Sequence, residues 1–348
     1  MFTKNTLFVI GAGASNEVGL PVGTALATTI ARMCTYRTEL GHVVEGDKEF
    51  ITRLAQQYSQ QSERDAHFKA ARQVAGGVQL VGSVDNYIDT HRHNPCVAAV
   101  AKFAIVYAIL RAEAASSLRM DWGDHPEAKI NFEKLEPSWF YQFGSMLVEG
   151  VPLVNIERLF NNIKIICFNY DRCIEHFLIN WVAAVYSIPQ EDAAREVAKL
   201  VILRPYGIIG PLLERNGAIP YGADPARYDA NSLKNGIKTY TEQIEDKELL
   251  QAIAAAVAEA EIIVFLGFGY HPWNMAILTP SKSVGAKRII ASAYQTSDAN
   301  KRNIHDMLRR LGGKTTKVRK GYPLVTIDPN MCGDVLANNR RDILAHDL

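Results

Sequence analysis

The 348-residue sequence predicts an α/β fold built on a buried parallel sheet, and three observations support that prediction. Short apolar runs alternate with longer helical patterns, and the runs are continuous, which is typical of strands that helices cover on both faces. The first run, Thr6–Ile10, passes through closely spaced glycines into a helical pattern. Several runs end in small or polar residues, at the edge where open α/β sheets bind ligands. Hydrophobic residues make up 48% of the chain, which is ample for the core of one large domain or two.

The individual strands and helices follow from the spacing of apolar residues. We expect strands at residues 6–10, 163–168, 201–203, 261–266 and 286–292. Helical spacing covers residues 24–33, 96–115, 137–149, 190–200, 245–260 and 299–311, and a further helix starts at Asp171 or Arg172.

The segment between the first two strands is long for a single βα unit. Every pattern between about residues 25 and 162 is helical, including an apolar, alanine-rich helix at 96–115 that is expected to be buried. Ser83 suits the N-cap of another helix that begins near Asp85. We therefore predict a helical subdomain inserted after the first βα unit of a domain that covers residues 1–312, followed by a C-terminal extension at 313–348.

Charge and targeting signals argue against several function classes. The net charge of +1 provides no overall field that would attract nucleic acid or an acidic membrane. The chain enters its first strand without a secretory signal pattern, and no apolar run is expected to span a bilayer. We therefore expect a cytoplasmic protein with no membrane partner and no evident nucleic-acid partner. The basic run at 314–320 is interpreted as a solvated face, with contact to a nucleic acid or an acidic partner as the alternative.

Cysteine and histidine usage argues against a metal site. The five cysteines are scattered and form no C-x-x-C pair, so we expect reduced thiols and no zinc. His91 and His93 form an H-x-H beside Asp89, but no further ligand has suitable spacing. We interpret them as part of a polar loop before Pro95 rather than as metal ligands.

Three predicted strands end in short polar or glycine-rich clusters, namely Gly11-Ala12-Gly13, Asn169-Tyr170-Asp171 and Gly267-Phe268-Gly269. Because the carboxyl ends of parallel strands share one edge of a sheet, the three clusters are expected to line one crevice. Glycines let a phosphate or an adenosine group approach the backbone, and the start of the helix after the first cluster favours an anion. The alternative is that the glycines only form tight turns.

Asn169 is the sharpest candidate for chemistry. Its amide offers donors and an acceptor, so it can hold a ribose hydroxyl or an attacking water without a change of charge. The alternative is that Asn169 and Asp171 only cap the following helix, a role that suits Asp171.

These blocks together resemble a known family. Gly11-Ala12-Gly13-Ala14-Ser15 with Gly19-Leu20-Pro21, then Asn169-Tyr170-Asp171 with Glu175, then Gly267-Phe268-Gly269-Tyr270 are similar in order and spacing to the bacterial sirtuin-like (silent-information-regulator-like) domains, over most of residues 5–295. The resemblance implies a Rossmann-type NAD-binding fold with a helical subdomain. It also implies an NAD-consuming enzyme of antiviral defence that acts in an assembly, as a homo-oligomer or with an ATPase or another defence-system protein.

The resemblance also assigns residues to parts of NAD. Gly11, Ala12, Gly13 and Ser15 would lie at the phosphates, and Pro21 near the nicotinamide ribose. Asn169 would orient that ribose or the water, with Asp171 nearby. The adenosine side would be flanked by Gly267, Phe268 and Gly269, and Ser292 or Tyr294 would approach the adenine.

One position departs from the family pattern. The family carries a His-Gly pair as catalytic base where this chain has Tyr206-Gly207. A tyrosine, with an ordinary pKa of about 10, is a poor base at neutral pH, whereas histidine titrates near about 6.5. His176 and His271 are the candidates to replace the imidazole, and the alternative for each is an ordinary core or surface histidine.

Two functions of different classes follow. The first is an NAD hydrolase that releases nicotinamide and ADP-ribose, with Asn169, Tyr206, Asp171, His176 and His271 as candidate catalytic residues. The second is a non-catalytic subunit that binds NAD or ADP-ribose, which the replacement at Tyr206 favours. Protein deacetylation is disfavoured, since the cysteine pairs of the accompanying zinc module are absent.

Overall fold

The protein is built around a six-stranded, all-parallel sheet with the order β5-β4-β1-β6-β7-β8. The computed structural model describes residues 1–39, 42–121, 129–212, 218–228, 233–239, 242, 246–279, 288–311 and 323–344. The sheet strands are β1 (Thr6–Ile10), β4 (Ile163–Cys167), β5 (Val201–Leu203), β6 (Ile262–Leu266), β7 (Arg288–Ser292) and β8 (Leu324–Asp328). Counted along the chain, the order is 3-2-1-4-5-6, which is that of a doubly wound, Rossmann-like sheet. The predicted α/β class is confirmed.

β1 lies in the middle of this sheet and pairs with β4 on one side and with β6 on the other. Its five residues are all buried. Ile10 pairs with Cys167 of β4 on one side and with Leu266 of β6 on the other. The three strands therefore end at the same edge of the sheet, and the clusters that follow them lie side by side. The strand order reverses between β1 and β6, which is where such sheets bind their ligands.

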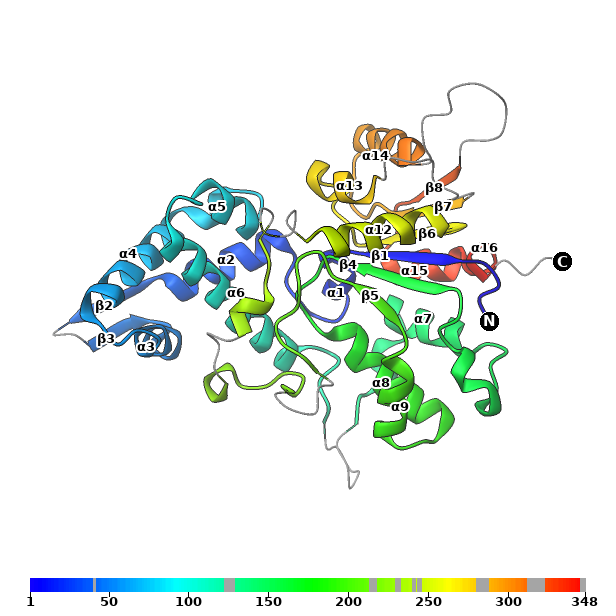
Figure 1. The fold of residues 1–348 in the computed structure, drawn as a ribbon, viewed down its shortest axis with the longest axis horizontal. Helices are drawn as coiled ribbons and strands as arrows, with labels where there is room; N and C mark the ends of the chain where they lie inside the picture. The colour runs from blue at the N-terminus through cyan, green and yellow to red at the C-terminus, as the bar shows by residue number, and fades with distance from the viewer. Residues whose placement is uncertain are drawn as a thin grey trace.

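Helices cover both faces of the sheet (Figure 1). Leu7 and Val9 of β1 belong to one hydrophobic core, and Phe8 and Ile10 belong to the other, because successive strand residues point to opposite faces. The first core includes α12 (Lys247–Glu259), α13 (Pro272–Leu278) and α14 (Asp298–Leu311). The second includes α7 (Trp139–Val148), α8 (Cys173–Tyr186), α9 (Gln190–Val197), α15 (Cys332–Asn338) and α16 (Arg340–Leu344).

The insertion, which is the segment from β1 to the end of α6 (Pro95–Ala115), forms a group of helices at one end of the molecule (Figure 1). After the short helix α1 (Ala12–Asn16) it holds α2 (Gly23–Cys34), α3 (Lys48–Gln56), α4 (Gln61–Gly77), α5 (Val84–Thr90) and α6. The predicted insertion of residues 25–162 is therefore too long, because α7 lies within that range but packs in the second core of the sheet. The expectation that this region is entirely helical is wrong, because β2 (Tyr36–Glu39) and β3 (His42–Gly46) form an antiparallel hairpin. Its residues are mostly exposed, so the hairpin leaves no apolar pattern in the sequence.

Helix α6 is the central helix of the insertion. Its 21 residues make it long and apolar enough to cross a membrane, which corrects the expectation that no run reaches that length. In this fold α6 packs against α2 and α4, and most of it is buried. Its apolar surface is therefore covered by protein, as predicted from its composition.

The segment after residue 312 contributes to the sheet. β8 pairs with β7 along its whole length, from Arg288 with Leu324 to Ser292 with Asp328, and α15 packs against α7. The predicted boundary at 312, with a separate extension at 313–348, therefore divides the sheet and is wrong. β8 is an edge strand of mostly half-buried residues, so it lacks the continuous burial that marks β1 and β6. The basic run at 314–320 lies outside the described residues.

Candidate functional site

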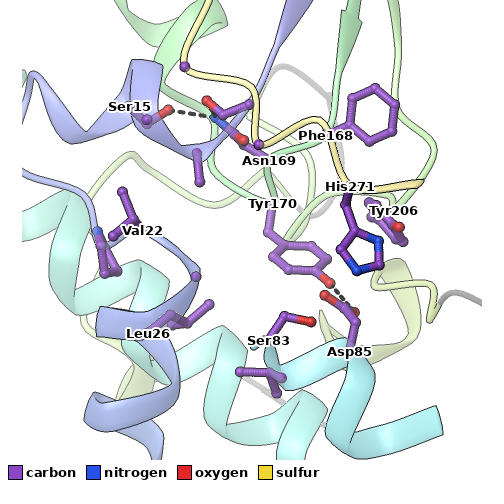
Figure 2. Close-up of a pocket in the computed structure, with 18 of the residues that line it drawn as sticks. Ser15, Val22, Leu26, Ser83, Asp85, Phe168, Asn169, Tyr170, Tyr206 and His271 are labelled. Carbon is purple, nitrogen blue, oxygen red and sulfur yellow. Dashed lines mark hydrogen bonds between the residues drawn. The ribbon is translucent and has the colours of Figure 1, made fainter. Parts of the chain in front are cut away.

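A cavity of about 490 Å³ lies where the carboxyl edge of the sheet faces the insertion (Figure 2). The turns after β1, β4 and β6 form the sheet side, and the segment leading into α2 and the start of α5 form the insertion side. The structure brings most of the predicted site residues to this one cavity. They are Gly11, Ala12, Gly13, Ser15, Pro21, Asn169, Asp171, Tyr206, Gly267, Phe268, Gly269 and His271.

Asn169 is held rigidly at the sheet side of the cavity. Its Nδ2 donates to the carbonyl oxygen of Gly11 at 3.1 Å and to Oγ of Ser15 at 2.9 Å, and Figure 2 shows the second bond. Gly11 directly follows β1 and Ser15 lies in α1, so the amide connects the segments that follow two adjacent strands. Among the described residues no donor to Oδ1 is found, which leaves that oxygen available to a ligand.

The glycines of the first and third clusters pack directly against each other. A Cβ on Gly11 would lie 2.6 Å from the carbonyl oxygen of Gly267, and a Cβ on Gly13 would lie 2.9 Å from Cα of Gly267. The amides of Gly11 and Gly13 donate to the carbonyls of Leu266 and Gly267. These two amides are therefore engaged within the protein, and the glycines serve mainly to bring two turns together.

Arg204 stabilises the backbone of the second cluster, Asn169-Tyr170-Asp171. Its guanidinium donates to the carbonyl oxygens of Asn169 at 3.0 Å and Asp171 at 3.1 Å, and it forms a bidentate ion pair with Glu175 at 2.7 and 2.8 Å. The carboxylate holds the pKa of Arg204 above its ordinary value. Sequence reasoning did not assign this role to Arg204, although an arginine directly after a strand needs a partner, and Glu175 belongs to the same motif block.

Asp85 is the acidic residue that sequence reasoning missed. It lies at the start of α5, lines the cavity and is half-buried. Its Oδ1 accepts a hydrogen bond of 2.6 Å from the hydroxyl of Tyr170. Burial raises the pKa of Asp85, and the bond from Tyr170 and the charge of Lys102 oppose that effect. Ser83 caps α5 as predicted, by accepting from the amide of Asn86.

Tyr206 and His271 lie on the remaining side of the cavity (Figure 2). The Tyr206 hydroxyl donates to Oδ1 of Asn274 at 2.7 Å, and its ring packs against Phe168. His271 is exposed and precedes α13. Asp171 is buried, and its Oδ1 accepts from the amide of Cys173 at the start of α8. The N-cap residue of α8 is Arg172 and not Asp171 as predicted, so Asp171 stabilises the turn just before the helix.

A second cavity of about 690 Å³ adjoins the first and shares Gly13, Val22 and the turn Gly267-Phe268-Gly269 with it. Ser292 and Tyr294, predicted near the adenine, line this second cavity and not the first. Ser292 accepts from the amide of Gly267 at 2.8 Å, while the Tyr294 side chain is about half exposed. The two cavities together follow the carboxyl edge from β4 to β7.

Acidic side chains line both cavities. The first is lined by the carboxyl groups of Asp85 and Asp171, and the second by that of Glu17. No lysine or arginine lines either cavity within the part of the chain that the structure describes.

His176 lies outside both cavities, so the prediction that it replaces the family's imidazole is wrong. Its side chain is buried on α8, with Nε2 3.0 Å from the carbonyl oxygen of Leu118 and its ring stacked on Tyr221. Burial lowers its pKa to about 4. The residue is an ordinary core histidine, which was the alternative interpretation.

His176 should make the fold sensitive to acid. Between pH 6.5 and 4 the unfolded chain takes up a proton at this ring and the folded chain does not, so the free energy of unfolding decreases as the pH falls. The shift corresponds to about 3 kcal/mol by pH 4. Urea unfolding at pH 7 and pH 4.5 should show a smaller pH effect for His176→Gln than for the wild type, with the exposed His67→Gln as control. An unchanged pH effect in His176→Gln would contradict this assignment.

Metal ligation finds no support in the described residues, which contain no group of three or more His, Cys, Asp or Glu side chains that could hold an ion. The five cysteines are free thiols. No protein-family model matches the chain, and no curated protein matches it either. The likeness to the sirtuin-like domains therefore stays a prediction from the residues themselves.

Proposed function

We propose that the two cavities bind NAD and that the protein hydrolyses the bond between nicotinamide and ribose. The observation that carries this proposal is the position of Asn169, whose amide is fixed at the carboxyl edge of a Rossmann-like sheet with Oδ1 left for a ligand. Open sheets of this order bind dinucleotides across the point where the strand order reverses.

The shape of the site supports a ligand with two halves. The first cavity contains Asn169 and the second contains Ser292, and the narrow turn Gly267-Phe268-Gly269 borders both. A dinucleotide bound across this turn would have its nicotinamide ribose beside Asn169 and its adenosine beside Ser292. Gly269, where an added Cβ would meet no atom within 4 Å, leaves room for the pyrophosphate to pass close to the backbone.

The charge of the first cavity supports the orientation. The nicotinamide ring of NAD is cationic, and cleavage of its bond to ribose develops positive charge on the sugar. Carboxylates of Asp85 and Asp171 in that cavity favour both charges more than a neutral wall would, because fixed charges in a shielded site act strongly on the transition state. Asn169 would position the ribose or the attacking water.

Asn169→Ala tests the proposal directly. We expect the rate of nicotinamide release from NAD to fall at least about 100-fold, the size typical for a lost polar group that contacts the reacting atoms. Nicotinamide is measured by chromatography, with the protein assayed alone and with the product of its neighbouring gene. Asn180→Ala, which removes an amide on α8 outside both cavities, should keep wild-type activity. Equal rates for Asn169→Ala and the wild type would refute the assignment.

A second candidate function is a non-catalytic subunit that binds NAD or ADP-ribose. The observation that favours it is Tyr206, which stands where the family has its histidine and whose hydroxyl is engaged with Asn274. Calorimetry that shows NAD binding with no release of nicotinamide, alone or with a partner, would decide for it. The antiviral role and the assembly with other proteins stay predictions from the family resemblance.

A further inference from the structure

We propose that Asp85, contributed by the helical insertion, is the catalytic base of the site and takes the place of the missing histidine. The inference rests on the proposed NAD hydrolysis and names a residue that neither the sequence motifs nor the resemblance assigned. It assigns a catalytic contribution to the insertion, whose helices otherwise form one wall of the cavity.

Geometry is the first argument. Figure 2 shows Asn169 and Asp85 on different sides of the cavity, with the Tyr170 ring between them and the Tyr170 hydroxyl directed at Asp85. The Asp85 carboxyl accepts from that hydroxyl and from its own main-chain amide. Both Asp85 and Asn169 line the same cavity, so one ligand can contact both.

The other polar groups of the cavity are less suited to the task. His176 points into the core, and the hydroxyl of Tyr206 is engaged with Asn274. Asp171 is buried, and its carboxyl contacts both the amide and the thiol of Cys173. Burial and the Asp85 carboxylate hold the pKa of Tyr170 well above its ordinary value, so Tyr170 stays a donor. His271 also lines the cavity but is exposed. Asp85 is the half-buried group, and burial raises its pKa, which brings it closer to the range of an effective base.

The reaction balances with these groups. The bond between C1′ of the ribose and the ring nitrogen breaks, and its electron pair leaves on nicotinamide, which becomes neutral. The positive charge on the sugar is stabilised by the Asp85 carboxylate. Water then forms a bond to C1′ and gives one proton to Asp85, which returns it to solvent, and ADP-ribose remains.

Three variants test the inference. Asp85→Asn should lower kcat for nicotinamide release at least about 100-fold, while calorimetry shows that ADP-ribose still binds. Asp85→Glu should restore part of kcat. Asp89→Asn, which removes a carboxyl one turn further along α5 and outside the cavity, should behave as the wild type.

The dependence of activity on pH distinguishes a catalytic role of Asp85 from a purely structural one. Activity of the wild type should fall on the acid side as Asp85 becomes protonated. The groups that face Asp85 are Tyr170 after β4, Lys102 on α6 and His271 before α13. Tyr170→Phe removes a donor that lowers the Asp85 pKa, so the acid limb of the activity profile should move to higher pH. Lys102→Met removes a positive charge that also lowers this pKa, so it should move the limb in the same direction. Loss of the acid limb in His271→Gln would assign the limb to His271 and overturn the proposal.

Each result has a definite meaning. A wild-type protein that binds no ADP-ribose, or that releases no nicotinamide from NAD, overturns the hydrolase and the base together. Nicotinamide release by the wild type with equal kcat in Asp85→Asn overturns only the base. Loss of activity in Tyr170→Phe as large as in Asp85→Asn, with no shift of the limb, would make the pair a structural contact and would also overturn it.

Discussion

Gly267→Ala is expected to lower the free energy of unfolding by about 3 kcal/mol or more, or to prevent folding. The added Cβ would lie 1.9 Å from the amide nitrogen of Ala14 and 2.3 Å from the carbonyl carbon of Gly13. These atoms are backbone, so no side-chain rotation can relieve the clash. Gly267 also has φ +58°, a conformation that costs a residue with Cβ further energy. Urea unfolding followed by circular dichroism measures the loss.

Gly269→Ala is the matched control in the same turn. A Cβ at Gly269 meets no atom within 4 Å, so the variant should unfold within about 0.5 kcal/mol of the wild type. Because Gly269 borders both cavities, its methyl group should nevertheless weaken ADP-ribose binding under the proposed function. A Gly267→Ala protein as stable as Gly269→Ala would show that the two turns do not pack as described.

The core of the fold could be predicted because its strands are continuous apolar runs. Each residue of β1 and β6 is buried, so both faces of these strands are apolar in the sequence, and the turn clusters that follow them were placed correctly on one edge. β8 escaped the same reasoning because its residues are mostly half-buried at the rim of the sheet. The hairpin β2–β3 is more exposed still and has no apolar signal at all.

Some residues of the site could likewise be predicted from local sequence, and others could not. Asn169 directly follows a recognisable strand, so its position at the carboxyl edge followed from local sequence. The contact of Asp85 with Tyr170 spans 85 residues and depends on how the insertion folds back, which no local pattern records. His176 was wrongly predicted to reach the site, because nearness to Asn169 in sequence did not bring its side chain into the cavity. It lies one turn into α8, the helix that follows Asn169. A helix directs successive side chains around its axis, and this ring is directed to Leu118.

Glu113→Ala is expected to lower the free energy of unfolding by about 3–5 kcal/mol. Glu113 on α6 and Arg172 before α8 form an ion pair that is fully buried on both sides. One Glu113 oxygen accepts from the main-chain amide and Nε of Arg172, both at 3.1 Å, and the other accepts from the amide of Gly222. Removing the carboxylate leaves the guanidinium buried without its counter-charge, which costs far more than the loss of a surface pair.

The exposed pair between Lys164 and Glu259 provides the comparison, and Glu259→Ala should cost less than about 1 kcal/mol. Equal losses for the two variants would show that the buried pair does not hold the fold. Arg172 directly follows the Asn169-Tyr170-Asp171 turn, so Glu113 joins the insertion to the segment that carries the proposed chemistry. If the insertion and the sheet unfold as one unit, Glu113→Ala should shift a single urea transition with an unchanged slope. A second transition would show instead that the insertion opens separately from the sheet, and the catalytic role proposed for Asp85 would then depend on that opening.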